Sequence, residues 1–285
     1  METRSTRISL AVWTALVIVF LWIPLVIIAL YAFNSSNIQG WPITSWTLHW
    51  FRVAWHDSDV RSALWLSIRA ALLASGAALV LGTMAAAAVV RFRFFGRETI
   101  SFLLVLPLAL PGIITGMALN SFLFSFVKVT PSLWTIVIGH ATFCVVVVYN
   151  NVVARLRRSS ASLIEASQDL GADGWQTFRF VVWPVLSTAL VAGGLLAFAL
   201  SFDEVIVTTF TAGAQETLPL FILHEIERGG QLPIVNVVAF FVIVVTVIPV
   251  ALAQRVMRDT GVIRRGAAQV TEAVEAVEAA EIPAV

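Results

Sequence analysis

Two neighbouring acids, Asp203 and Glu204, lie between strongly apolar segments of the chain. An aspartate inside a membrane costs about 2.5–3.5 kcal/mol on insertion scales, so such a group is normally paired or faces water. In a structural interpretation, the acids pair with Arg69 or cap a broken helix. In a chemical interpretation, they attract a cation, and the aromatic faces of Phe202 and Trp65 contact its amines through cation–π interactions. Both interpretations remain open.

Other polar residues in the apolar segments give weaker chemical signals. Thr208 follows the acids and is added to this candidate pathway, although a hydroxyl in a membrane helix commonly forms an interhelical hydrogen bond instead. His140 has no metal-ligand partner at i+4, and the single cysteine, Cys144, excludes an intrachain disulfide and a cysteine-based metal site. Because no Ser/His/Asp or paired-carboxylate constellation is placed for catalysis, we expect neither a catalytic residue nor a metal here.

The composition is that of a membrane-embedded chain. Hydrophobic residues make up 59% of its 285 residues, charged residues make up 12%, and the mean hydropathy is +0.91. A run of about 20 apolar residues is long enough to cross the hydrocarbon core as a helix. We therefore expect an all-α polytopic membrane protein with six transmembrane helices. The uncharged runs are Leu10–Phe33, Ala70–Val90, Ile100–Val127, Ser132–Val153, Val181–Leu200 and Leu232–Ala253.

Two of these runs carry signals for helix packing. From Ala70 to Ala86, a small residue recurs at every fourth position, which favours close approach of another helix. In the third run, Pro107, Pro111 and Gly112 weaken the backbone hydrogen-bond ladder, so we expect a kinked helix there. The kinked helix either lines a transport pathway or is kinked only to pack against its neighbours.

Basic residues fall mostly on one side of the predicted spans. If both termini are cytoplasmic, thirteen arginines lie on the cytoplasmic side, four basic residues lie outside, and Arg69 lies at the edge of a span. This asymmetry obeys the positive-inside rule, so we expect a multi-pass plasma-membrane protein with both termini in the cytoplasm. The cytoplasmic set is Arg4, Arg7, Arg91, Arg93, Arg97, Arg155, Arg157, Arg158, Arg179, Arg255, Arg258, Arg264 and Arg265, and the outer set is Arg52, Arg61, Lys128 and Arg228.

The stretch EASQDLGADGWQTFRFVVWP is far more polar than the apolar runs on either side of it. Ser162 followed by Glu165 fits a capping box, and Gly171 is expected to end the helix that these residues begin. Asp173, with Gln176 three residues on, is expected to cap a second short helix. On physical grounds alone, this pair of helices is also consistent with an interfacial loop whose apolar face dips into the inner leaflet.

The spacing within this stretch resembles the EAA signature of ABC-importer permeases, E-A-A-x3-G-x9-I-x-L-P. The departures are Ser167 for Ala, Val181 for Ile and Trp183 for Leu. Three longer segments, RETISFLLVLPLALPGIITGMAL, GHATFCVVVVYNNVVARLRR and LAFALSFDEVIVTTFTAG, are similar to the second permease subunit of spermidine/putrescine-type importers, the PotC-like group. The resemblance runs from the first span to the sixth.

This resemblance implies a type I ABC-importer permease (MetI-like) fold in the inner membrane of a bacterium. It implies alternating access driven by a separate ATPase, which binds a coupling loop at about residues 155–184. The implied partners are a second permease subunit forming a heterodimer, two ATPase subunits that bind ATP and Mg, and an external substrate-binding protein. The implied coupling residues are Glu165, Ala166, Ser167, Asp169, Leu170, Gly171 and Pro184.

The chain itself lacks the residues of an ATPase. A P-loop requires a lysine in G-x-x-x-x-G-K-[ST], and the single lysine, Lys128, lies in FVKVT on the predicted outer side. We therefore expect a subunit that is not an enzyme and needs no cofactor of its own. The net charge of +1 gives no basis for a nucleic-acid surface.

The sequence leaves alternatives open for the cargo and for the class of function. The resemblance implies polyamine import. γ-Aminobutyrate or another small amine is an alternative cargo. A passive channel or a membrane scaffold is a function of a different class that the same six helices allow. We expect a permease domain over residues 1–265 and an acidic low-complexity cytoplasmic tail over residues 266–285, where glutamates recur in an Ala/Val background. The tail is assigned no function.

Overall fold

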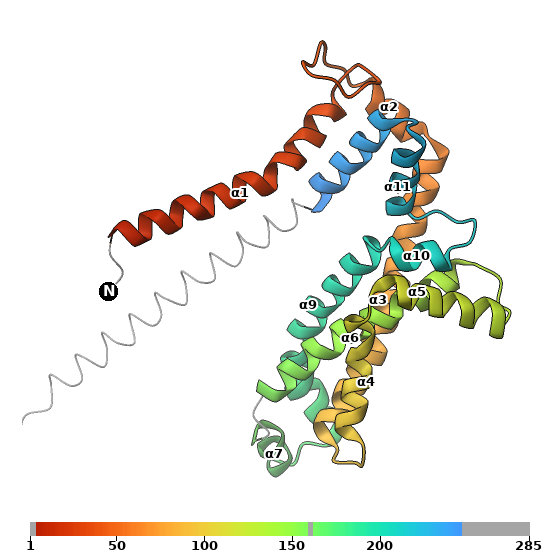
Figure 1. Cartoon of the computed structure of the whole chain (residues 1–285). Helices are drawn as coiled ribbons and strands as arrows, with labels where there is room; N and C mark the ends of the chain where they lie inside the picture. Colours follow the sequence, from red (N-terminus) through yellow and green to blue (C-terminus); the bar gives the residue numbers. More distant parts are fainter. Residues whose placement is uncertain (1–3, 159–161, 247–285) are drawn as a thin grey trace, which may run out of the picture. The chain divides into compact units, whose positions relative to one another are not determined.

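In the computed structural model, residues 4–158 and 162–246 are described, and the regular structure within these ranges is helical (Figure 1). An isolated bridge between Asn34 and Trp46 is the single extended pairing within the same ranges. The all-α prediction is therefore confirmed for the described chain.

Four helices are long and apolar enough to cross a membrane, and a bent pair makes a fifth span if it is counted as one. The four are Ser5–Ala32, Ser58–Arg91, Leu133–Arg158 and Gly174–Phe202. The last predicted run corresponds to the shorter apolar helix Leu232–Thr246, and its remainder lies outside the described residues. The predicted runs therefore coincide with helices, although the count of six is not exact.

The third run is two helices, so the prediction of one kinked helix is wrong. α4 (Arg97–Ala109) and α5 (Gly112–Asn120), which continues into the π-helical turn η1 (Ser121–Phe126), meet at 102°. The break lies at Leu110, whose ψ of 141° is extended. A residue before a proline is driven out of the helical region by contact with the proline ring, and Pro111 follows Leu110 directly. Pro111 therefore accounts for the extended conformation of Leu110, at which α4 ends.

The chain divides into two compact units, residues 1–54 with 231–285 and residues 55–230. The first unit contains α1 (Arg4–Ala32), most of α2 (His49–His56) and the helix Leu232–Thr246. Three rings join these parts: Phe33 lies 4.9 Å from Phe51 and 5.5 Å from Phe240, measured between ring centroids. Most apolar side chains of α1 are exposed, as expected for a helix that faces lipid or another subunit.

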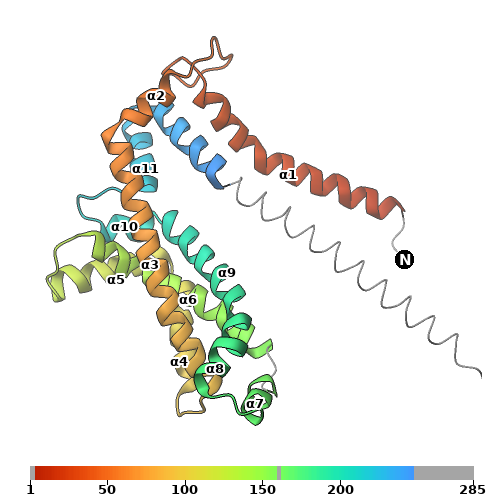
Figure 2. The same ribbon diagram turned by 180° about the vertical axis from the view of Figure 1, so that it is seen from behind.

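The second unit is built around three long helices, α3 (Ser58–Arg91), α6 (Leu133–Arg158) and α9 (Trp183–Phe202), which lie side by side in both views (Figures 1 and 2). α3 begins twelve residues before the predicted run at Ala70, because Asp57 caps it by accepting hydrogen bonds from the N–H groups of Asp59 and Val60.

The small residues of α3 form a close helix contact, as predicted, and the helix that they contact is α6. Ala70, Ala74, Ala78 and Ala86 are at most 1% exposed. A Cβ placed on Gly82 would lie 2.9 Å from the carbonyl oxygen of Val145, so the two backbones are nearly in contact. α9 in turn packs against both α3 and α6.

Short elements complete the second unit. At the end where α6 finishes lie α7 (Ser162–Asp169), α8 (Gly174–Thr177) and the π-helical turn η2 (Phe178–Val182). At the opposite end of α9 lie α10 (Ile206–Thr211), which packs against α5, and α11 (Leu218–Arg228), which packs against α3 (Figure 1). The coupling loop and the acid pair therefore occupy opposite ends of α9.

Candidate functional site

The predicted coupling loop, residues 155–184, contains α7 as its first short helix. This helix ends at Gly171, whose φ of +82° is a left-handed conformation that glycine adopts without steric penalty. The N–H of Ala172 donates to the carbonyl of Ser167, which closes the end of the helix. The prediction that Gly171 ends this helix is confirmed. The start of α7 is not tested, because the residues before Ser162 lie outside the described ranges.

The second short helix has the predicted capping box. The N–H of Gln176 donates to Oδ1 of Asp173 at 2.8 Å, and the N–H of Asp173 donates to Oε1 of Gln176 at 3.0 Å. These reciprocal bonds satisfy donors that the first turn of a helix leaves unpaired. They fix the direction in which the chain leaves the turn at Gly171.

A hydroxyl pair holds the two short helices together. Oγ of Ser167 lies 3.0 Å from Oγ1 of Thr177, which is 3% exposed, and also donates to the carbonyl of Ile164 at 2.8 Å. Ser167 is one of the departures from the signature, and the hydroxyl that it adds is used here. Sequence reasoning missed Thr177, because no helical period relates two residues separated by a turn.

Several side chains of the coupling loop remain uncovered. Leu170 is 89% exposed, Trp175 is 66% exposed and Phe180 is 70% exposed. Glu165, Ala166 and Asp169 are exposed on α7 as well. Large exposed apolar side chains beside charged ones are typical of a surface that binds a partner or a membrane.

Pro184 lies in the first turn of α9, and α9 continues the helix that precedes it without a break. The helix runs from Gly174 to Phe202 and passes through η2 just before the proline. In η2 the N–H of Trp183 donates to the carbonyl of Phe178, five residues back. A proline supplies no N–H to the ladder, and a wider turn next to it lets the helix continue. The loop and the span are thus one element.

The acid pair lies at the break between α9 and α10. Asp203 is exposed and is the C-cap of α9, where its N–H donates to the carbonyl of Ala199. Oε1 of Glu204 accepts a hydrogen bond of 2.8 Å from the N–H of Val207 in the first turn of α10. The cap on a broken helix, one of the structural interpretations, is confirmed for Glu204.

The predicted pairing with Arg69 is absent from the described chain. The ion pairs within residues 4–158 and 162–246 are formed by Glu216 and Glu225 instead. The guanidinium group of Arg69 lies 5.5 Å from the centroid of the Trp65 ring on the same helix. The face that Trp65 was expected to offer a cation is therefore occupied by an arginine of the chain itself.

A buried network of hydrogen bonds lies next to the acid pair. His140 on α6 is 1% exposed; its Nδ1 lies 2.8 Å from Oγ of Ser201, and its Nε2 lies 2.8 Å from Oγ1 of Thr208. Oγ1 of Thr208 also donates to the carbonyl of Glu204 at 2.6 Å. The expected interhelical hydrogen bond of Thr208 is confirmed. Its side chain is fully buried, so Thr208 supports the acids from within the protein.

The predicted pathway residues gather only in part. Phe202, Asp203, Glu204 and Thr208 belong to one short segment, and the ring of Phe202 stacks on Phe198 at 6.0 Å. Trp65 is 57% exposed on α3, and within residues 55–158 and 162–230 no hydrogen bond or ring contact joins it to the acids. No cluster of three or more metal-ligating side chains occurs among the residues that the structure describes.

The chain is similar to known membrane transport proteins over most of its length. Residues 78–260 match the family described as binding-protein-dependent transport system inner membrane component. The putrescine transport system permease protein PotI of Escherichia coli K12 is 34% identical over 235 residues, which cover 79% of this chain and 82% of that protein.

Two further proteins extend this likeness. The spermidine/putrescine transport system permease protein PotC of the same strain is 31% identical over 245 residues, 84% of this chain and 90% of that protein. A solved bacterial ABC transporter involved in the import of the acidic polysaccharide alginate covers 90% of this chain and 98% of its own, with a TM-score of 0.65 and 18% identity. The structural likeness concerns the fold.

Proposed function

Because this chain belongs to the family of binding-protein-dependent transport system inner membrane components, we propose that it carries polyamines such as putrescine or spermidine across the membrane. It is the permease subunit of an ABC importer and a multi-pass inner-membrane protein. Relatives that are 31–34% identical to it over 79–84% of its length are named for putrescine and spermidine transport. Polyamine cargo is inferred for this chain from those names and from the acid pair at the α9–α10 break.

The observation that carries the proposal is the geometry of the coupling loop. α7 and α8 form a compact pair, held by Ser167 and Thr177, that presents Leu170 and Trp175 to the outside. A rigid element with exposed apolar side chains suits insertion into a groove on another subunit. We assign the coupling role to Glu165, Ala166, Ser167, Asp169, Leu170, Gly171 and Pro184.

The partners follow from the family and set the stoichiometry that we propose. One similar permease completes the pathway, two ATPase subunits bind ATP and Mg, and an external binding protein delivers the cargo. The thirteen arginines on one side of the spans favour cytoplasmic termini and a cytoplasmic coupling loop. ATP hydrolysis is assigned to the partner, since the single lysine of this chain is not in a P-loop.

The acid pair supports an amine cargo. The carboxylate of Asp203 is exposed, and an aspartate that faces a water-filled path attracts cations. Glu204 is already used as a cap, so we assign the cargo-facing charge to Asp203 and the supporting role to Glu204 and Thr208. Phe202 is the aromatic neighbour at the same break.

Transport into proteoliposomes tests the proposal. The chain is reconstituted with its second permease, its ATPase and its binding protein, and uptake of labelled putrescine, spermidine and γ-aminobutyrate is compared with and without ATP. We expect ATP-dependent uptake of a polyamine and none with an ATPase whose P-loop lysine is replaced. Preference for γ-aminobutyrate would reassign the cargo within the importer class, and uptake that persists without ATP would identify a passive channel.

A further inference from the structure

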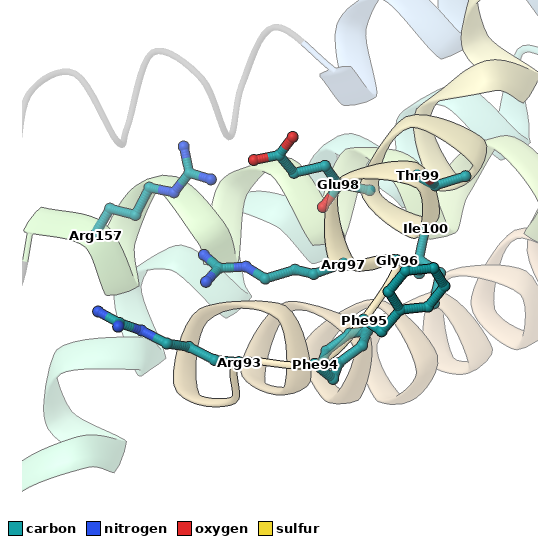
Figure 3. Close-up of a pocket in the computed structure, with 10 residues that line it drawn as sticks. Arg93, Phe94, Phe95, Gly96, Arg97, Glu98, Thr99, Ile100 and Arg157 are labelled. Carbon is teal, nitrogen blue, oxygen red and sulfur yellow. The ribbon is translucent and has the colours of Figure 1, made fainter.

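A pocket of about 840 Å³ lies where α3 ends and α4 begins, and of its lining residues only Arg157 belongs to a site described above, at the start of the predicted coupling loop (Figure 3). Residues 93–101 form most of its wall, and Arg157, near the end of α6, completes it. We call it the arginine pocket after Arg93, Arg97 and Arg157. In Figure 3 the guanidinium groups of Arg93 and Arg97 extend to the same side, towards the part of α6 that carries Arg157.

The arginine pocket carries unbalanced positive charge. Glu98 is the single acid among its lining residues, against three arginines. Within residues 4–158 and 162–246, ion pairs form at Glu216 and Glu225, and none involves these arginines. Converging guanidinium groups repel one another unless an anion lies between them. Three guanidinium groups without a carboxylate partner therefore favour an anionic ligand.

The first turn of α4 adds hydrogen-bond donors to the same pocket. The helix is capped by Gly96, which has a φ of +80° and no side chain to accept from the first N–H groups. The N–H of Arg97 donates to the carbonyl of Phe94 at 3.4 Å, so the N–H groups of Glu98 and Thr99 are the donors that this turn offers. The positive end of a helix dipole and its unpaired N–H groups bind phosphate well. Arginine matches phosphate by paired N–H···O bonds in a planar fork. The donor set of the pocket is thus that of a phosphate site.

The position of the pocket points to a lipid as the source of that phosphate. α3 ends at Arg91 and α6 ends at Arg158, so the pocket lies where two membrane-spanning helices reach their ends. Phe92 and Phe95 are 64% and 103% exposed beside it. Exposed phenylalanine rings offer apolar surface that acyl chains can cover, and a soluble phosphate would make no use of them.

We propose that the arginine pocket binds the phosphate of an anionic phospholipid, with the acyl chains passing the exposed phenylalanines. Basic pockets between membrane helices are general binding places for such headgroups. The proposal needs only a membrane-inserted chain and is independent of the cargo, so it stands whether the transporter carries polyamines or another amine.

Lipid retention by the purified full chain provides the test. The protein is exposed to mixed micelles of phosphatidylglycerol and phosphatidylcholine, and bound lipid is measured by native mass spectrometry. Arg93→Gln/Arg97→Gln/Arg157→Gln is compared with Arg7→Gln/Arg91→Gln/Arg158→Gln, which removes the same charge outside the pocket. We expect about tenfold lower preference for phosphatidylglycerol in the pocket variant and wild-type preference in the control.

Equal loss of preference in both triple variants would overturn the proposal, because it would mean general attraction to positive charge. A thermal shift of the protein with inorganic phosphate in phosphatidylcholine micelles, abolished in the pocket variant and without selective lipid retention, would overturn the lipid source. If the triple variant does not fold, Arg157→Lys replaces it. That change keeps the charge and removes the planar fork, so severalfold weaker retention supports the site and unchanged retention contradicts it.

Discussion

The Nε2 atom of His140 lies 2.8 Å from the hydroxyl of Thr208, and both side chains are at most 1% exposed. This contact ties α10 to α6 directly beneath the acids at the α9–α10 break. The second nitrogen of His140 contacts Ser201 on α9. One imidazole therefore holds three helices at the end of the molecule where we place the cargo.

Replacing Thr208 by valine is expected to destabilise the chain. The substitution keeps the volume and leaves Nε2 of His140 buried without its partner, which costs about 1–3 kcal/mol. Thermal unfolding in detergent, followed by tryptophan fluorescence, measures the loss. Thr209→Val is the matched control, because Thr209 is exposed and bonds only to the carbonyl of Val205. Equal effects of the two variants would contradict the importance of the buried contact.

Two glycines of α3 are expected to respond oppositely to alanine. A Cβ at Gly82 meets the carbonyl oxygen of Val145 at 2.9 Å and the nitrogen of Tyr149 at 3.0 Å, so the helices must separate, at about 1–3 kcal/mol. A Cβ at Gly76 meets nothing within 4 Å. Gly76→Ala should therefore be neutral or stabilise the helix by about 0.5–1 kcal/mol. The melting temperatures of the two variants check this difference.

Gly171→Ala is expected to weaken coupling without a steric clash. No atom lies within 4 Å of a Cβ at this position, but the φ of +82° is strained for alanine by about 1–2 kcal/mol. We expect less stimulation of the partner ATPase by cargo-loaded binding protein, with normal membrane insertion. Gly174→Ala is also free of contacts and has no positive φ. Loss of stimulation by Gly174→Ala to the same extent would argue against the turn.

Asp203 and Glu204 are expected to have different roles, one in transport and one in stability. Asp203→Asn removes an exposed charge that makes no capping bond, so polyamine uptake should fall while the melting temperature stays unchanged. Glu204→Leu removes the acceptor of the Val207 N–H and should lower stability by about 0.5–2 kcal/mol. Glu204→Gln keeps an acceptor and is the control for stability. Unaltered uptake by Asp203→Asn would remove its assignment to the cargo path.

Local signals in the sequence predicted the local structure of the coupling loop. Asp173 and Gln176 are three residues apart, and the capping box that they form needs no tertiary contact. Gly171 likewise ends α7 through its own backbone freedom. The small-residue stripe of α3 predicted a close helix contact but not its partner, because the stripe does not say which helix lies against it.

The structure differs from the sequence-based predictions where contacts with distant segments, or the conformation of a neighbouring turn, determine the path of the backbone. The 102° bend at Pro111 exceeds what a proline imposes alone, and α5 is held in its place by α10, as when Nδ2 of Asn120 donates to the carbonyl of Phe210. Helix continuation through Pro184 depends on a π-helical turn that has no composition signature. The sequence predicts Trp65 beside the acids, whereas its ring contacts Arg69 on the same helix.

The unbroken helix from Gly174 to Phe202 has a mechanical consequence. At 29 residues it is about 43 Å long, and it joins the coupling loop at one end to Asp203 at the other. A rod of this length turned by about 10° moves its far tip by about 7 Å. A tilt imposed at Gly174 would therefore displace Asp203 directly, and the π-helical turn beside Pro184 is a place where the helix can bend.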